Sequence, residues 1–126
     1  MASIHLEWHR FTGFLQLREQ FRSRPCIYLQ TDPHERILRV GESNDPWHRY
    51  PGGTAYALDA ALHGSGNLFF AAPAPVDKAE RQALEATLIY DLQPPYNNQH
   101  KDSPPVPRVA YVHEGEVPKP FREAPP

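Results

Sequence analysis

Residues 25–43, PCIYLQTDPHERILRVGES, decide the fold of this chain because they contain two strand-like runs separated by a turn. The runs are Cys26–Gln30 and Arg36–Val40, and residues 31–35, TDPHE, connect them. In this connection Asp tolerates tight backbone geometry and Pro fixes its own φ. The pattern therefore predicts a β-hairpin.

Successive side chains of a strand point to opposite faces, so the hairpin has two distinguishable sides. Four apolar residues share one side and are the predicted core face: Ile27, Leu29, Leu38 and Val40. Tyr28 and Arg39 lie on the other faces of their strands and point the same way if the hairpin is in register.

A long helix is predicted from about residue 77 to residue 92. Asp77 is followed three residues later by Glu80, which is a capping-box arrangement, and no Gly or Pro interrupts the segment before Pro94. Positions 85, 88, 89 and 92 share one helical stripe, and the last three are Leu, Ile and Leu. The first is Glu85, and a carboxylate beside an apolar stripe costs free energy unless a cation or hydrogen-bond donors meet it. The alternative is a boundary glutamate that turns out to solvent.

Other elements follow from local patterns. Alternation over 4–8 predicts a short strand, Thr12-Gly13 a helix start, and Pro46 the first turn of a helix that carries Arg49. Residues 54–63 are predicted to be helical and 67–72 to form a third central strand. The predicted organisation is one domain over 24–100, an N-terminal extension over 1–23 and a proline-rich tail over 101–126, with a possible strand at 108–112.

Bulk properties limit the classes of function. The chain has 126 residues and a formal net charge of −2, which argues against high-affinity non-specific DNA binding by the whole molecule. Residues 1–50 carry seven Arg against six acidic residues, so we expect an anionic ligand to bind on the side of the N-terminal half. One cysteine excludes an intrachain disulfide. No signal-peptide core or membrane-length apolar run occurs, so we expect a cytoplasmic protein without a membrane partner.

The strings above resemble the GIY-YIG nuclease superfamily over about residues 24–99. Pro25-Cys26-Ile27-Tyr28 resembles the first half-motif with Cys in place of Gly, and Arg39-Val40-Gly41-Glu42-Ser43 resembles the second. Arg49 follows Gly41 by eight residues, where these nucleases carry an arginine. The acidic helix with Glu85 and the closing Pro94, Tyr96 and Asn97 complete the likeness. The order and spacing of the four motifs are more specific than any one of them.

This resemblance implies an α+β domain with a small three-stranded antiparallel sheet flanked by helices. It also implies an endonuclease site that hydrolyses phosphodiester bonds of DNA with Mg²⁺ or Mn²⁺. Tyr28 would act as general base or as a hydrogen-bond donor to the phosphate, and Arg49 would neutralise charge on the phosphorus. Glu85 would hold the cation and Asn97 would orient the site.

The chain departs from the family pattern at Arg39, which replaces the tyrosine of the second half-motif. Arginine cannot act as a general base at ordinary pH, although it can clamp a phosphate. Ser43, Trp47 and His48 are further candidates for substrate binding, Trp47 by stacking on a base and His48 by protonating the leaving group. For Trp47 and His48 the alternatives are a core tryptophan and a surface histidine. Two other functions stay open: a non-hydrolytic nucleic-acid-binding or interaction module, and an enzyme acting on a small anionic metabolite.

Overall fold

The computed structural model describes residues 3–49 and 68–122, apart from the side chains of Leu15, His48 and Arg49. Its strands are β1 (Ile4–Phe11), β2 (Cys26–Thr31), β3 (Ile37–Ser43), β4 (Leu68–Pro73) and β5 (Tyr111–Gly115). Its described helices are α1 (Phe14–Gln20), α2 (Pro46–Arg49), α4 (Lys78–Leu92) and α5 (Lys119–Arg122). The helix predicted over 54–63 lies outside the described residues.

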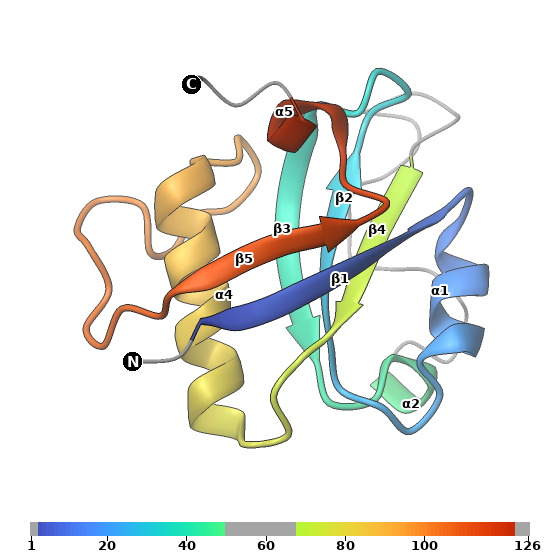
Figure 1. Cartoon of the computed structure of the whole chain (residues 1–126), viewed down its shortest axis with the longest axis horizontal. Helices are drawn as coiled ribbons and strands as arrows, with labels where there is room; N and C mark the ends of the chain where they lie inside the picture. The colour runs from blue at the N-terminus through green and yellow to red at the C-terminus, as the bar shows by residue number, and fades with distance from the viewer. Residues whose placement is uncertain (1–2, 50–67, 123–126) are drawn as a thin grey trace.

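The described strands form one sheet in the order β3-β2-β4-β1-β5 (Figure 1). All neighbours are antiparallel except β1 and β5, which are parallel. The predicted three-stranded antiparallel sheet is therefore wrong, because this is a five-stranded mixed sheet in an α+β fold. The reason is burial: Leu6 and Trp8 of β1 are fully buried, which the strand achieves by pairing with β4 inside the sheet.

The fifth strand comes from the proline-rich segment and starts three residues later than the strand predicted there. It pairs with β1, and it brings His113 to the indole of Trp8, whose Nε1–H donates a hydrogen bond of 3.0 Å to His113 Nδ1. The His113 ring also stacks on Phe121 of α5, with centroids 3.8 Å apart. This aromatic packing, rather than local strand preference, holds β5 in place.

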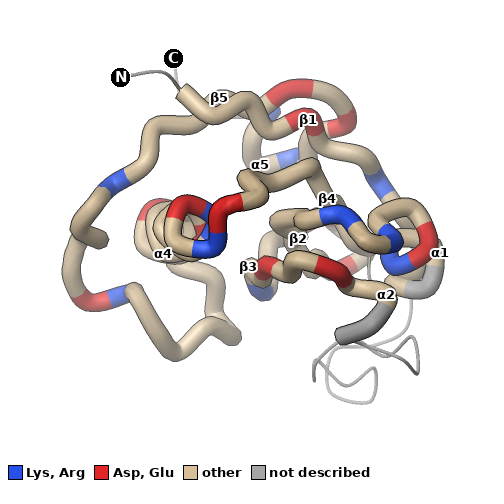
Figure 2. Tube along the Cα trace, turned by 90° about the horizontal axis from the view of Figure 1, so that it is seen from below, with Lys and Arg blue, Asp and Glu red and all other residues tan. Residues whose placement is uncertain are grey.

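The predicted hairpin is confirmed, with Tyr28 opposite Gly41 and Leu29 opposite Val40. Its two faces are buried in two cores, since α4 covers one side of the sheet and α1 the other (Figure 2). Ile27 and Leu29 belong to the core under α4, whereas Cys26 and Tyr28 belong to the core under α1. Strand β3 lies at the edge of the sheet, beside α4.

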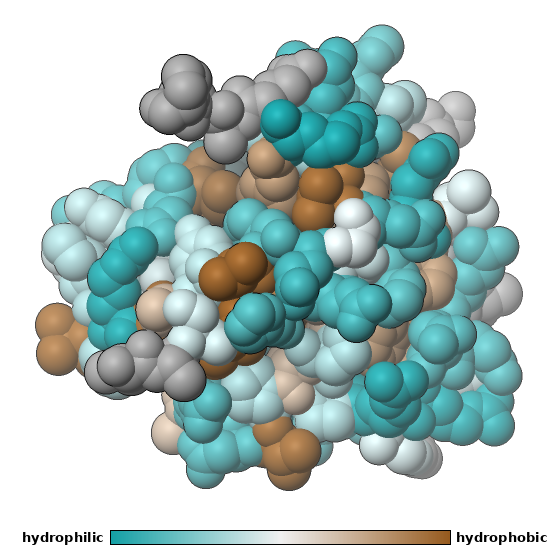
Figure 3. Space-filling view, in the orientation of Figure 1, coloured by the Kyte–Doolittle hydropathy of each residue, from teal (hydrophilic) through white to brown (hydrophobic). Residues whose placement is uncertain are grey.

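The long helix α4 also agrees with its prediction. The Asp77 carboxylate accepts a hydrogen bond of 2.9 Å from the backbone N–H of Glu80, and Gln93 ends the helix in the left-handed conformation. Figure 3 shows the front of the molecule as largely hydrophilic, with apolar side chains in separate patches. In the described ranges no helix combines the length and the apolar character that a membrane crossing requires.

Candidate functional site

The ring of Tyr28 lies against the backbone of β3 because Gly41, its cross-strand partner, has no side chain. A Cβ at position 41 would fall 2.4 Å from the Cζ atom and 2.5 Å from the hydroxyl oxygen of Tyr28. Phe14 of α1 packs edge-on against the same ring, with centroids 5.7 Å apart. Tyr28 is 2% exposed, so its ring is held in place by its close contacts with buried neighbours.

A polar cavity of about 580 Å³ lies between β3 and α4. Its wall contains the predicted residues Tyr28, Arg39 and Glu85, which come from β2, β3 and α4. Lys78 and Arg81 add two cations, and amide side chains complete much of the remaining wall. A cavity with a phenol, cations and carboxylates has the groups needed to bind an anion and a cation together.

An ion pair that the local sequence patterns do not predict lies in the wall of this cavity. Arg81 of α4 and Glu42 of β3 meet at 2.5 Å, and their side chains are 5% and 10% exposed. The Arg81 guanidinium also donates to the backbone carbonyls of Pro75 and Val76. Two features of the sequence indicate that these residues lie on the same side of their elements as the core. Arg81 lies one helical turn before Glu85, and Glu42 follows Val40 by two residues on the same face of its strand. Besides the pair of Arg81 and Glu42, the cavity wall contains two further cations, Arg39 and Lys78.

A second cavity, of about 270 Å³, shares Arg39, Glu85 and Gln99 with the first and is otherwise formed by Val40, Ile89 and residues 96–98. Asn97 fixes this part of the site. Its side chain accepts a hydrogen bond of 2.9 Å from the N–H of Val40 and donates one of 3.0 Å to the carbonyl of the same residue. The amide therefore ties the loop after α4 to the outer edge of β3.

The partly buried carboxylate of Glu85 is the predicted metal ligand. Within residues 3–49 and 68–122 no group of three or more His, Cys, Asp and Glu side chains is arranged to hold a metal ion. A structural zinc site needs such a group, whereas Mg²⁺ keeps several waters and takes one or two carboxylates. One carboxylate is compatible with Mg²⁺ or Mn²⁺, and the role of Glu85 as metal ligand stays a prediction.

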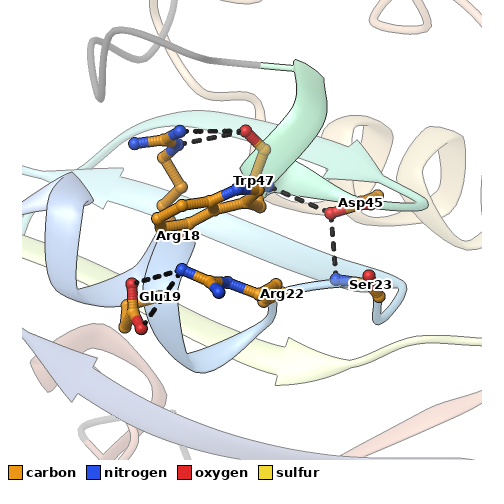
Figure 4. A network of polar contacts seen from close by, with 6 residues as sticks. All are labelled: Arg18, Glu19, Arg22, Ser23, Asp45 and Trp47. Carbon is orange, nitrogen blue, oxygen red and sulfur yellow. Dashed lines mark hydrogen bonds and ion pairs between the residues drawn. The ribbon is translucent and has the colours of Figure 1, made fainter.

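Trp47 is held away from this wall by two arginines of the α1 region (Figure 4). The guanidinium carbons of Arg18 and Arg22 lie 4.0 Å and 3.6 Å from the centroid of the indole, and Figure 4 shows the ring between them. Arg18 also donates two hydrogen bonds to the Trp47 carbonyl. This packing attaches α2 to α1 and covers the ring whose predicted role is to stack on a base.

Three other predicted residues have different outcomes. Ser43 is buried at the end of β3, where its hydroxyl accepts a hydrogen bond of 3.1 Å from the N–H of Asp45. The side chains of His48 and Arg49 lie outside the described part, so their predicted roles stay predictions.

Cys26 belongs to the core under α1, where it is fully buried. Burial raises the pKa of its thiol to about 12, and the nearby Glu42 carboxylate adds to the effect. A thiol in this environment stays protonated and is inert as a nucleophile at neutral pH.

Comparison with known family models, with characterised proteins and with solved structures finds no match. The geometry of the cavity, together with the motifs of the sequence, is therefore the basis for a functional proposal.

Proposed function

We propose that the cavity between β3 and α4 hydrolyses phosphodiester bonds of DNA with Mg²⁺ or Mn²⁺, as the resemblance to GIY-YIG nucleases implies. The observation that carries the proposal is that Tyr28, Arg39 and Glu85, which come from three separate elements, line one polar cavity.

In this proposal Arg39 and Lys78 bind the phosphate. Both line the cavity, and the fork of the Arg39 guanidinium suits bidentate contact with phosphate oxygens. These cations give the cavity a local positive character that the net charge of −2 conceals.

Tyr28 orients the reacting groups. Its ring is fixed by Gly41 and Phe14, so its hydroxyl occupies a defined position in the cavity wall. From there it holds the attacking water or donates a hydrogen bond to the phosphate. Arg49, at the end of α2, is the proposed source of further charge stabilisation on the phosphorus.

Glu85 binds the divalent cation. When bound, the cation supplies positive charge that stabilises the phosphoryl transition state and lowers the pKa of water. Asn97 keeps the loop after α4 attached to β3 by two hydrogen bonds, which fixes the position of Glu85 relative to Arg39.

The test is nicking of supercoiled plasmid by the purified chain in Mg²⁺ or Mn²⁺. Glu85→Gln is expected to abolish nicking, and Tyr28→Phe to reduce it by at least about a hundredfold. Glu80→Gln is the matched control, because it removes the same charge from an exposed position of the same helix outside the cavity. The proposal fails if the wild-type chain does not nick, or if Glu85→Gln nicks as fast as Glu80→Gln.

The arginine at position 39 supports a second candidate function, in which the site binds nucleic acid without cleaving it. Its guanidinium stands where the resemblance places a tyrosine, and it cannot accept a proton at ordinary pH. In that case Arg39→Ala would weaken binding to a short DNA duplex while Glu85→Gln would leave it unchanged or stronger. Arg39→Tyr would then add the missing phenol and produce nicking that the parent chain lacks.

A further inference from the structure

We infer that the second cavity, formed by residues 96–99 beside Arg39 and Glu85, binds one unpaired nucleobase of the substrate strand, stacked on Tyr96. This inference rests on the proposed function, because it assigns a place for the base attached to the phosphate that the first cavity would bind.

Position is the first argument. Arg39, Glu85 and Gln99 line both cavities, so the two cavities are adjacent and share these residues as a common wall. A nucleotide with its phosphate against Arg39 in the larger cavity must extend its sugar and base to a neighbouring position. The smaller cavity is such a position, and it contains an aromatic ring.

Chemistry is the second argument. Tyr96 is 46% exposed, although large aromatic side chains are usually more buried, and it lines the smaller cavity together with Asn98 and Gln99. Within the described residues the side-chain amides of Asn98 and Gln99 make no hydrogen bond. An aromatic face for stacking and amides that both donate and accept are the groups that recognise a base and its edge.

Rigidity is the third argument, because a preformed platform loses little entropy on binding. The N–H of Tyr96 donates a hydrogen bond of 3.1 Å to the carbonyl of Leu38, and the Asn97 side chain bonds to both backbone groups of Val40. Lys101 Nζ donates at 2.7 Å to the carbonyl of Pro94, and Gln93 bonds to the carbonyl of Lys101. Hydrogen bonds therefore hold residues 96–99 on both sides of this segment, which follows the orange end of α4 in Figure 1.

A base inside a duplex has both faces covered by its neighbours, so only an unpaired or extruded base can stack on Tyr96. The substrate class that follows is single-stranded DNA, or a duplex interrupted by unpaired nucleotides.

The experiment measures binding of short fluorescein-labelled single-stranded oligonucleotides by anisotropy, without divalent metal and in the Glu85→Gln background, so that cleavage is not required. One oligonucleotide is complete, and each of the others carries a single abasic residue at a successive position. We expect one abasic position to weaken binding about tenfold. Tyr96→Ala should weaken binding of the complete strand by the same factor and remove the effect of that abasic position.

Tyr96→Phe keeps the ring and should bind like the parent, and Tyr90→Ala, at an aromatic of α4 outside both cavities, is the matched control. The inference is overturned if Tyr96→Ala binds like Tyr90→Ala, or if a fully paired duplex binds as tightly as the single strand. Failure of nicking with base-dependent binding intact would refute hydrolysis and leave this site standing. Nicking without base dependence would do the opposite.

Discussion

Replacement of Gly41 by alanine tests whether close packing of Tyr28 against β3 builds the site. The added Cβ would lie 2.4, 2.5 and 2.9 Å from the Cζ, hydroxyl and Cε1 atoms of Tyr28, whereas ordinary contacts begin near 3.4 Å. The ring must therefore move by about 1 Å, and Phe14, which packs edge-on against it, leaves little space for that movement.

The expected loss of unfolding free energy follows from two opposing effects. Overpacking of a filled core costs about 1–3 kcal/mol, and the smaller entropy of an unfolded chain with alanine returns about 0.4–1 kcal/mol. We expect a net loss of about 1–2 kcal/mol, measured by urea unfolding. Because the hydroxyl of Tyr28 shifts, nicking should fall by at least about tenfold at a temperature where the variant is folded.

Gly13→Ala is the matched control. No atom lies within 4 Å of a Cβ at position 13, and the backbone there is extended, so we expect a change within about 1 kcal/mol. A second control is Tyr28→Leu, in whose background Gly41→Ala should cost less, because the ring tip is gone. If Gly41→Ala is as stable as Gly13→Ala and nicks like the parent, close packing of Tyr28 against β3 does not build the site.

Three further predictions concern the stability of the fold. Arg81→Met leaves Glu42 buried without its partner, so the free energy of unfolding in urea should fall by about 3–5 kcal/mol. The double variant Arg81→Met with Glu42→Met should recover most of that loss. A loss under about 1 kcal/mol for Arg81→Met alone would contradict this prediction. Burial lowers the pKa of His113 to about 4, below its ordinary value of 6.5, so the unfolded chain binds more protons between these values and stability should decrease as pH falls from 6.5 towards 4. Because this side chain is partly exposed, the decrease should be about 1–2 kcal/mol, and His113→Gln, compared with the parent over the same pH series, should remove it. Asp91→Asn weakens the two 2.7 Å hydrogen bonds from Arg108 and the hydrogen bond from the Tyr111 hydroxyl. The backbone amides of β5 should therefore exchange hydrogen faster than in Asp102→Asn, a control at an exposed residue. Equal exchange rates in the two variants would show that Asp91 does not anchor the segment.

Much of the candidate site can be predicted from local patterns. Strand alternation put Tyr28 and Arg39 on one side of the hairpin, and the register confirms it. The helical stripe singled out Glu85, which the structure places in the same cavity as these two residues. Each of these inferences uses a period of the backbone, so it needs no knowledge of distant contacts.

The buried pair of Glu42 and Arg81 was missed because each residue, taken alone, is of a type that usually lies at the surface. Glu42 and Arg81 are 39 residues apart in the sequence, and the pattern of one strand or one helix does not specify a partner at that distance. The same reason explains the error in the sheet. Alternation predicted β1 as a strand, but it did not identify β4 and β5 as its neighbours, and prolines obscured β5.

The parallel pairing of β1 with β5 has a consequence for how the chain is made. Ile4 pairs with Tyr111 and Trp8 with Gly115, so this contact closes a loop of about a hundred residues, which is slow compared with local turns. While a ribosome is still adding the middle of the chain, β1 can join β4 but has an open edge on its other side. An open edge pairs readily with other strands, so the nascent protein should be most prone to aggregation before residues 111–115 emerge, and a chaperone that shields β1 would act in that interval.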